Sequence, residues 1–179
     1  MSRAGRGPVV VDPEAIRAGD DELGIGDGDA AGGTYSLVYE LEEAARIDVG
    51  ALGDCAFPAG AYAYVGSAHG SNGLGRVARH RRVASGDHDV RHWHVDYLGG
   101  HPESTLVSVV ASPNADIECR VARRLRSSDA SPSAGEREPL SVPVPRFGSS
   151  DCDCTAHLAS GRDAETVLSA VVESFEGKE

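Results

Sequence analysis

The chain has 179 residues and a formal net charge of −11, from 28 acidic residues against 17 basic ones. This length suffices for one domain with a hydrophobic core, and no apolar run approaches the roughly 18 residues of a membrane span, so we expect a soluble protein without a membrane partner. Residues 1–8 contain no apolar signal segment, and a cytoplasmic location is therefore the expectation.

The first part of the chain is predicted to be irregular and the next part rich in strands. Residues 1–32 are rich in glycine and aspartate and are expected to form a flexible acidic arm, in which the run Val9–Val11 could still pair as an edge strand. After Gly33 the pattern changes, and β-rich runs separated by glycine-rich turns predict three short strands at 34–41, 45–49 and 61–65.

The second half is predicted to contain most of the helices. Apolar spacing indicates a helix from about residue 74 to 84, whose other side carries arginine and histidine, and then a strand at 105–111. Another apolar stripe predicts a helix ending near residue 126, and the tail 161–179 forms a last amphipathic helix. The fold class is therefore α+β, with a small antiparallel or mixed sheet flanked by helices in a single domain over residues 33–160.

Charge is unevenly distributed. Sixteen of the 17 basic residues are arginine, and this scarcity of lysine with an excess of carboxylates is typical of a halophilic protein. Residues 76–126 hold nine arginines and six acids, a local charge of +3 that leaves −14 for the rest, and six of the seven histidines lie between residues 69 and 101. Arginine binds phosphate bidentately, so the pattern favours a phosphate-binding face, although arginines paired with carboxylates on solvated helices would give the same count.

Three short motifs follow one another along the chain. Gly33-Thr-Tyr35 and Tyr64-Val-Gly66 lie on two predicted strands, and Arg76-Val-Ala-Arg-His80 lies on the next helix. This order resembles the GIY-YIG nuclease superfamily. It is more similar still to one archaeal and bacterial subfamily, catalogued as a domain of unknown function and sometimes fused to endonuclease III. That likeness extends through Gly73–His80, His92–Leu98, Glu118-Cys119 and Phe147–Leu158.

The resemblance implies a divalent-metal-dependent endonuclease that hydrolyses phosphodiester bonds in structured or damaged DNA, with RNA the less favoured partner. In the superfamily, tyrosines help to activate the nucleophile, an arginine steadies the phosphate and a glutamate holds a divalent metal. The matching positions are Tyr35, Tyr64, Arg76 and Glu118. His80, one helical turn after Arg76, could shuttle a proton, and Glu118 with water ligands suits Mg²⁺ or Mn²⁺. Further candidates for substrate binding are Gly66, Ser67, Arg79, His92, His94 and Asp96.

Plainer interpretations of these residues stay open. Tyrosine is a favoured strand residue, and a glutamate in the first turn of a helix is favoured by the helix dipole. His92, His94 and Asp96 could form an additional metal or phosphate site if they lie on a strand, whereas a helix would separate them. A non-catalytic nucleic-acid-binding module of the same fold is the second interpretation of function.

The cysteines offer a possible zinc site. Cys152, Cys154 and His157 form a C-x-C-x-x-H cluster, and thiolates with an imidazole are zinc ligands. The spacing is tighter than in most zinc sites, and no second ligand pair follows along the chain, which favours a tight turn held by local hydrogen bonds. A zinc-stabilised interaction domain is the third interpretation of function.

Overall fold

The computed structural model describes residues 7–28, 30–88, 91, 93–126, 140–149 and 152–176. Within these residues the chain forms one α+β domain, which confirms the predicted fold class. Its main sheet has five strands in the order β1 (Val9–Val11), β6 (Ser104–Pro113), β2 (Gly33–Leu41), β5 (Gly60–Ala68) and β7 (Leu158–Gly161). Every neighbouring pair is antiparallel. A separate hairpin consists of β3 (Ala45–Asp48) and β4 (Asp54–Phe57), which flank a short 3-10 helix at Gly50–Leu52.

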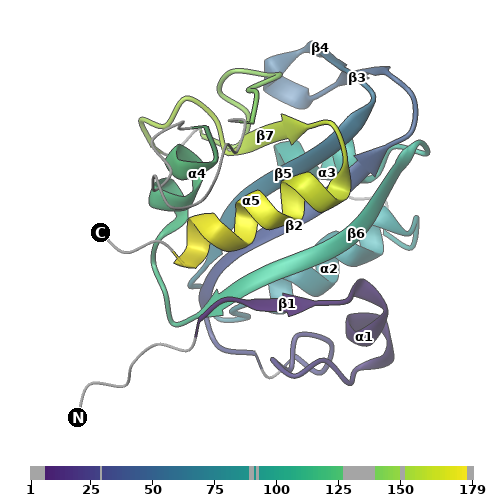
Figure 1. Cartoon of the computed structure of the whole chain (residues 1–179). Coiled ribbons are helices and arrows are strands. Elements are labelled where there is room, and N and C mark those ends of the chain that lie inside the picture. The colour runs from purple at the N-terminus through teal and green to yellow at the C-terminus, as the bar shows by residue number, and fades with distance from the viewer. Residues whose placement is uncertain are drawn as a thin grey trace.

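Helices cover both faces of the sheet. Figure 1 shows α5 (Ala164–Glu176) crossing in front of the strands, while α2 (Gly75–Ala84) and α3 (His94–Gly99) lie behind them. The helix α4 (Glu118–Arg126) shares a core with α5, and α1 (Pro13–Ala18) contributes to the core on the other face together with α2 and α3. The domain is therefore a three-layer sandwich with one core on each side of the sheet.

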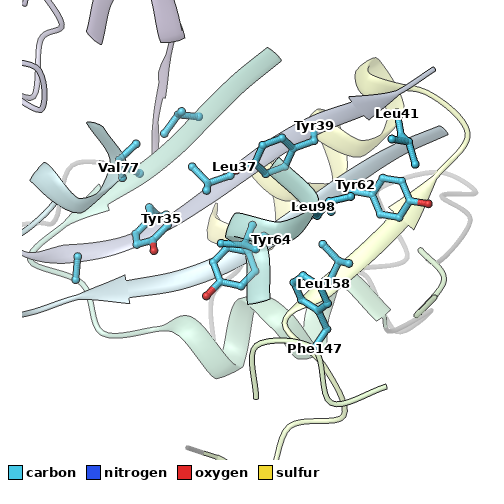
Figure 2. Close-up of a cluster of buried hydrophobic side chains, with 14 of the residues drawn as sticks. Tyr35, Leu37, Tyr39, Leu41, Tyr62, Tyr64, Val77, Leu98, Phe147 and Leu158 are labelled. Atoms are coloured by element: carbon cyan, nitrogen blue, oxygen red, sulfur yellow. The ribbon is translucent and has the colours of Figure 1, made fainter. Parts of the chain in front are cut away.

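The alternation of side chains along β2 creates the two cores. Tyr35, Leu37 and Tyr39 point to the face covered by α2 and α3, and Figure 2 shows them beside Tyr62 and Tyr64 of the neighbouring strand β5. Val38, which lies between them in sequence, packs on the other face with α4 and α5. Because both faces are covered, a central strand of this sheet is buried along nearly its whole length.

The described part of the predicted N-terminal arm is folded against the domain. Within residues 7–28 the run Val9–Val11 pairs with β6 as the edge strand, and α1 follows it. The side chains of Ile16 and Ile25 are 3% and 1% exposed, and the carboxylate of Asp21 accepts hydrogen bonds from the amides of Ile25 and Gly26. Two isoleucines in a glycine-rich segment thus provide enough apolar surface to hold it, which the lack of periodicity did not reveal.

The strands at 34–41, 45–49, 61–65 and 105–111 and the helices predicted at 74–84, up to residue 126 and in the C-terminal tail are confirmed, with ends that differ by a few residues. The helix α3 was not predicted. Two short strands, β4 and β7, were not predicted, because four residues are too few to display a period of two convincingly. None of the described helices has the length and apolar character needed to cross a membrane.

Candidate functional site

The pairing of β2 with β5 brings the two tripeptide motifs together. Tyr35 lies opposite Gly66, and Thr34 lies opposite Ser67. The rings of Tyr35 and Tyr64 are neighbours on one face, with centroids 6.4 Å apart, and in Figure 2 both hydroxyl groups point to the same side of the sheet. The antiparallel register therefore converts two motifs distant in sequence into one tyrosine pair.

Gly66 makes room for this pair. A Cβ atom at this position would lie 2.6 Å from the hydroxyl oxygen of Tyr35 and 3.1 Å from Cε1 of Tyr64. Carbon atoms in contact are separated by about 3.5 to 4.0 Å, so any larger side chain would displace the tyrosines. Gly66 of β5 therefore leaves the space in which the ring of Tyr35 lies over that strand.

A buried chain of hydrogen bonds runs from Tyr35 to α3. The hydroxyl of Tyr35 lies 2.9 Å from Nε2 of His80, and Nδ1 of His80 lies 3.2 Å from a carboxylate oxygen of Asp96. Burial lowers the pKa of His80 despite the hydrogen bond and charge of Asp96, which act in the opposite direction. The ring is therefore neutral near pH 7. Because a carboxylate accepts, Nδ1–H donates to Asp96, and Nε2 accepts from the tyrosine hydroxyl.

Asp96 is fully buried at the end of this chain. Its carboxylate accepts a hydrogen bond from Arg79 at 3.1 Å and another, also at 3.1 Å, from the amide of Trp93. The helix α3 separates Asp96 from His94, whose Nδ1 accepts instead from the amide of Gly148. Of the two alternatives for this segment the structure has the helix, which separates His94 from Asp96, and His92 lies outside the described residues.

Arg76 is held beside the tyrosine pair from two directions. Its guanidinium donates to the carbonyl of Ser67 at 2.7 Å and lies 4.9 Å above the ring of Trp93. Arg79 lies 4.6 Å from the same ring, so both cations stack on one indole. Burial raises the pKa of Tyr35 well above its usual range, while nearby Arg76 acts to lower it. Tyr35 is thus a neutral phenol beside a fixed cation.

Glu118 approaches from the opposite face of the sheet. Thr34 places it, because the Thr34 hydroxyl donates to the carbonyl of Ala115 at 2.9 Å and accepts from the amide of Ile117 at 3.1 Å. These bonds fix the turn that leads into α4. Burial alone would raise the pKa of Glu118, but the adjacent ring of His157, together with Ser67 and the charge of Arg76, lowers it overall.

Five predicted residues therefore gather at one end of the sheet, namely Tyr35, Tyr64, Arg76, His80 and Glu118. They are not equally accessible. Tyr35 and His80 are each only 1% exposed, whereas the side chain of Glu118 is 25% exposed. A ligand from solution would meet the arginine and the glutamate first, above the buried tyrosine and histidine.

The basic stretch of residues 76–126 does not form one continuous face. Four of its arginines lie on α2, and four others lie on α4, which packs on the opposite side of the sheet. Arg124 of α4 donates to the carbonyl of Ser174 in α5. The arginines beside the tyrosine pair are therefore those of α2, and the count along the sequence combines two separate surfaces.

The cysteine cluster has a fourth member that its spacing did not predict. Cys119, in the first turn of α4, lies with Cys152, Cys154 and His157 so that their four ligand atoms are all within 4.8 Å of one another. Nε2 of His157 is 3.2 Å from Sγ of Cys152 and 4.0 Å from Sγ of Cys119. Among the described residues this Cys3His cluster is the one group of its kind, and it could bind a metal ion. The interpretation as a turn alone is therefore incomplete.

The thiols of this cluster influence one another. Burial and the two neighbouring thiols raise the pKa of Cys154 to about 12. The pKa of Cys152 is lowered, because hydrogen bonds from Cys154 and the nearby His157 outweigh its burial. The thiols therefore oppose one another's ionisation, and a positive ion bound among them would relieve that repulsion.

His157 also connects the cysteines to Glu118. Its Nδ1 lies 2.9 Å from Oε1 of Glu118, close enough for an ion pair when the ring is protonated. The backbone of His157 is fixed, since its carbonyl accepts from the amide of Val65 and its amide donates to the carbonyl of Phe147. One imidazole thus faces the thiols on one side and the carboxylate on the other.

Sequence reasoning missed the roles of Cys119 and Asp96. Cys119 lies 38 residues before His157, and Asp96 lies 16 residues after His80, so no local spacing marked either partner. One feature of the sequence does point to Cys119: it is adjacent to Glu118 in the pair Glu118-Cys119, which is part of the family likeness.

Fold and site together define an α+β domain in which a buried tyrosine and histidine pair lies beside a Cys3His cluster. A family model matches residues 34–179, and the chain belongs to that family, which is described as Domain of unknown function DUF123. No curated protein and no solved structure matches the chain.

Proposed function

We propose that the protein is a divalent-metal-dependent endonuclease that hydrolyses phosphodiester bonds in structured or damaged DNA. The observation that carries this proposal is the hydrogen-bond chain from Tyr35 through His80 to Asp96, with the cation of Arg76 beside it. The resemblance of the motifs to the GIY-YIG nuclease superfamily supports the same chemistry. A buried relay of this kind is suited to removing a proton from water near neutral pH.

The relay works without a tyrosinate. The raised pKa of Tyr35 keeps it neutral, so its oxygen accepts a proton from the attacking water while its own proton passes to Nε2 of His80. Asp96 then stabilises the imidazolium through Nδ1–H. The proton leaves the water, the phenol ends as it began, and the histidine holds the added proton until it passes back through Tyr35 to solvent; the leaving oxygen takes its proton from water.

Phosphate binding falls to the more accessible residues. The guanidinium of Arg76 would stabilise the charge that develops on the phosphoryl oxygens. Glu118 would hold Mg²⁺ or Mn²⁺ together with water and phosphate oxygens, because Mg²⁺ in proteins is commonly bound by one or two carboxylates plus the substrate. Such an ion would neutralise charge on the phosphate and on the leaving oxygen.

The Cys3His cluster suits a different metal. Thiolates are soft ligands, which favour zinc over Mg²⁺ or Mn²⁺, and four protein ligands leave no open position for a substrate. Zinc in this cluster would therefore stabilise the fold. We keep this structural zinc from the third interpretation and do not propose an interaction domain.

A second candidate is a nucleic-acid-binding module without catalysis. The low exposure of Tyr35 and His80 favours it, since a relay that never meets water would serve only to stabilise the core. In that case Arg76 would contribute to binding alone.

Cleavage of labelled duplex, branched and single-stranded DNA and RNA in molar KCl, with Mg²⁺, Mn²⁺ or a chelator, tests the proposal. We expect metal-dependent cleavage by the wild type and large losses in Arg76→Ala and Glu118→Ala. Arg82→Ala is the matched control, because Arg82 is an exposed arginine on the same helix. Equal cleavage by all four proteins would refute the site, and binding without any cleavage would favour the module.

A further inference from the structure

We propose that a single Zn²⁺ bound by Cys119, Cys152, Cys154 and His157 positions Glu118 through the second nitrogen of His157. The zinc site is argued from the cluster itself. The consequence for Glu118 rests on the proposed function, because it concerns the residue that would hold the divalent ion for cleavage.

The dimensions of the cluster fit tetrahedral zinc. With zinc–sulfur bonds of about 2.3 Å, two sulfur ligands of a tetrahedron are separated by about 3.8 Å, and sulfur and nitrogen ligands by slightly less. The ligand atoms here all lie within 4.8 Å of one another, and Nε2 of His157 lies 3.2 Å from Sγ of Cys152 and 4.0 Å from Sγ of Cys119, on either side of the separation expected in a tetrahedron. Small side-chain adjustments would complete the geometry.

A disulfide would account for the cluster less well. All three of its cysteines are free thiols, and a disulfide between any two would leave the third thiol facing an imidazole nitrogen. Zinc uses all four groups at once. Three partly or fully buried sulfur atoms beside one histidine are therefore a ligand set rather than an oxidised pair.

His157 has the arrangement typical of a zinc ligand. Histidines bound to zinc usually present the other ring nitrogen to a carboxylate, which fixes the tautomer and the orientation of the ring. Here Nε2 faces the thiols, and Nδ1 lies 2.9 Å from Oε1 of Glu118. Glu118 and Cys119 are adjacent in the first turn of α4, so zinc would hold this turn directly by one residue and indirectly by the other.

The position of Glu118 depends on this contact. Its carboxylate interacts with Ser67, Arg76 and His157. Zinc would bond the loop that carries His157 to the first turn of α4 through Cys119. We therefore expect the metal to determine where the carboxylate stands relative to Arg76 and the tyrosine pair.

Metal content tests the zinc site without any cleavage assay. The full chain, reconstituted with Zn²⁺ and freed of loosely bound metal, should hold about one zinc per chain. Substitution with Co²⁺ should give thiolate-to-metal charge-transfer bands and the intense visible bands of a tetrahedral complex. Cys119→Ser should lose both, while Cys55→Ser should keep both, since Cys55 is a buried cysteine on β4 whose thiol bonds to backbone carbonyls away from the cluster. A wild type without zinc, or a Cys119→Ser variant with unchanged spectra, would overturn the assignment.

The variant His157→Cys separates metal binding from the positioning of Glu118. Four cysteines still bind zinc, and the backbone bonds of residue 157 are kept, but the contact with the carboxylate is lost. We expect retained zinc with cleavage lowered at least tenfold and a higher Mg²⁺ concentration needed for half-maximal rate. Retained zinc with unchanged cleavage and Mg²⁺ dependence would refute the coupling and leave the zinc site intact.

A spectroscopic measurement decides the coupling even if the wild type cleaves nothing. In nitrogen-15 NMR of the zinc-bound protein, Nε2 of His157 should have the shift of a metal-bound nitrogen, and the Nδ1 proton should exchange slowly with water. Glu118→Ala should move the Nδ1 resonance and speed its exchange while zinc stays bound. An unchanged Nδ1 resonance in that variant would overturn the coupling, whereas absence of cleavage alone would count against the proposed function.

Discussion

Gly66→Ala tests the close approach of β5 to the tyrosine pair. The added Cβ would lie 2.6 Å from the Tyr35 hydroxyl and 2.7 Å from Cζ of the same ring. The ring must retreat by roughly 0.8 Å to reach normal carbon contact. Tyr35 is 1% exposed, so this shift has to be taken up by its neighbours.

The structure gives the size of the expected effect. Overpacking of this kind costs about 1 to 3 kcal/mol, and a hydrogen bond of 2.9 Å to His80 stretched by that shift would lose about 1 kcal/mol more. A displacement of this order in a reacting group can lower a rate about a hundredfold. We therefore expect a loss of roughly 2 to 4 kcal/mol in the free energy of unfolding and cleavage lowered by about two orders of magnitude.

Denaturant unfolding in molar KCl and the cleavage assay measure both effects. Gly70→Ala is the control, because no atom lies within 4 Å of a Cβ at that position, and its stability should stay close to the wild type. If Gly66→Ala unfolds at the same denaturant concentration as the wild type, the argument from close packing is wrong.

The other predictions concern the groups around this pair. Asp96→Asn should lower cleavage on the order of a hundredfold, because the amide no longer holds His80 with Nδ1 protonated; an unchanged rate would mean that His80 needs no orientation. Burial lowers the pKa of His80 below the value of about 6.5 in the unfolded chain, so unfolding takes up a proton at low pH. The free energy of unfolding should therefore fall as the pH decreases below about 6.5, and it should fall less in His80→Gln; equal slopes in the two proteins would refute the depressed pKa. Thr34→Val should cost about 1 to 3 kcal/mol in unfolding experiments, since the carbonyl of Ala115 and the amide of Ile117 both lose their partner; a neutral substitution would show that water replaces the hydroxyl.

The sequence contains much of the fold in local form. The alternation of Tyr35, Leu37 and Tyr39 indicates a strand, and the apolar spacing of Leu74, Val77 and Val83 indicates the helix that carries Arg76 and His80. Pairing of the two motif strands does not follow from chain order, because the hairpin of β3 and β4 lies between β2 and β5 in the sequence and forms a sheet of its own.

The site itself is only partly visible in the sequence. The residue pattern leaves open whether His94 and Asp96 lie on a strand or on a helix; the helix α3 turns the two side chains apart and buries Asp96 against His80. Cys119 joins the cysteine cluster because α4 starts at the end of the sheet where β5 meets β7. Contacts of this kind depend on the packing of whole elements, which local residue patterns do not encode.

Cleavage by Tyr35→Phe tests the central claim most directly. The substitution removes the hydroxyl that bonds to His80 and keeps the buried ring, while Tyr39→Phe makes the same change at another buried tyrosine on the same face of β2. The account predicts that the wild type and Tyr39→Phe cleave structured DNA with Mg²⁺ or Mn²⁺ in molar KCl, whereas Tyr35→Phe folds but loses at least about a hundredfold in rate. Equal cleavage by all three proteins would contradict it.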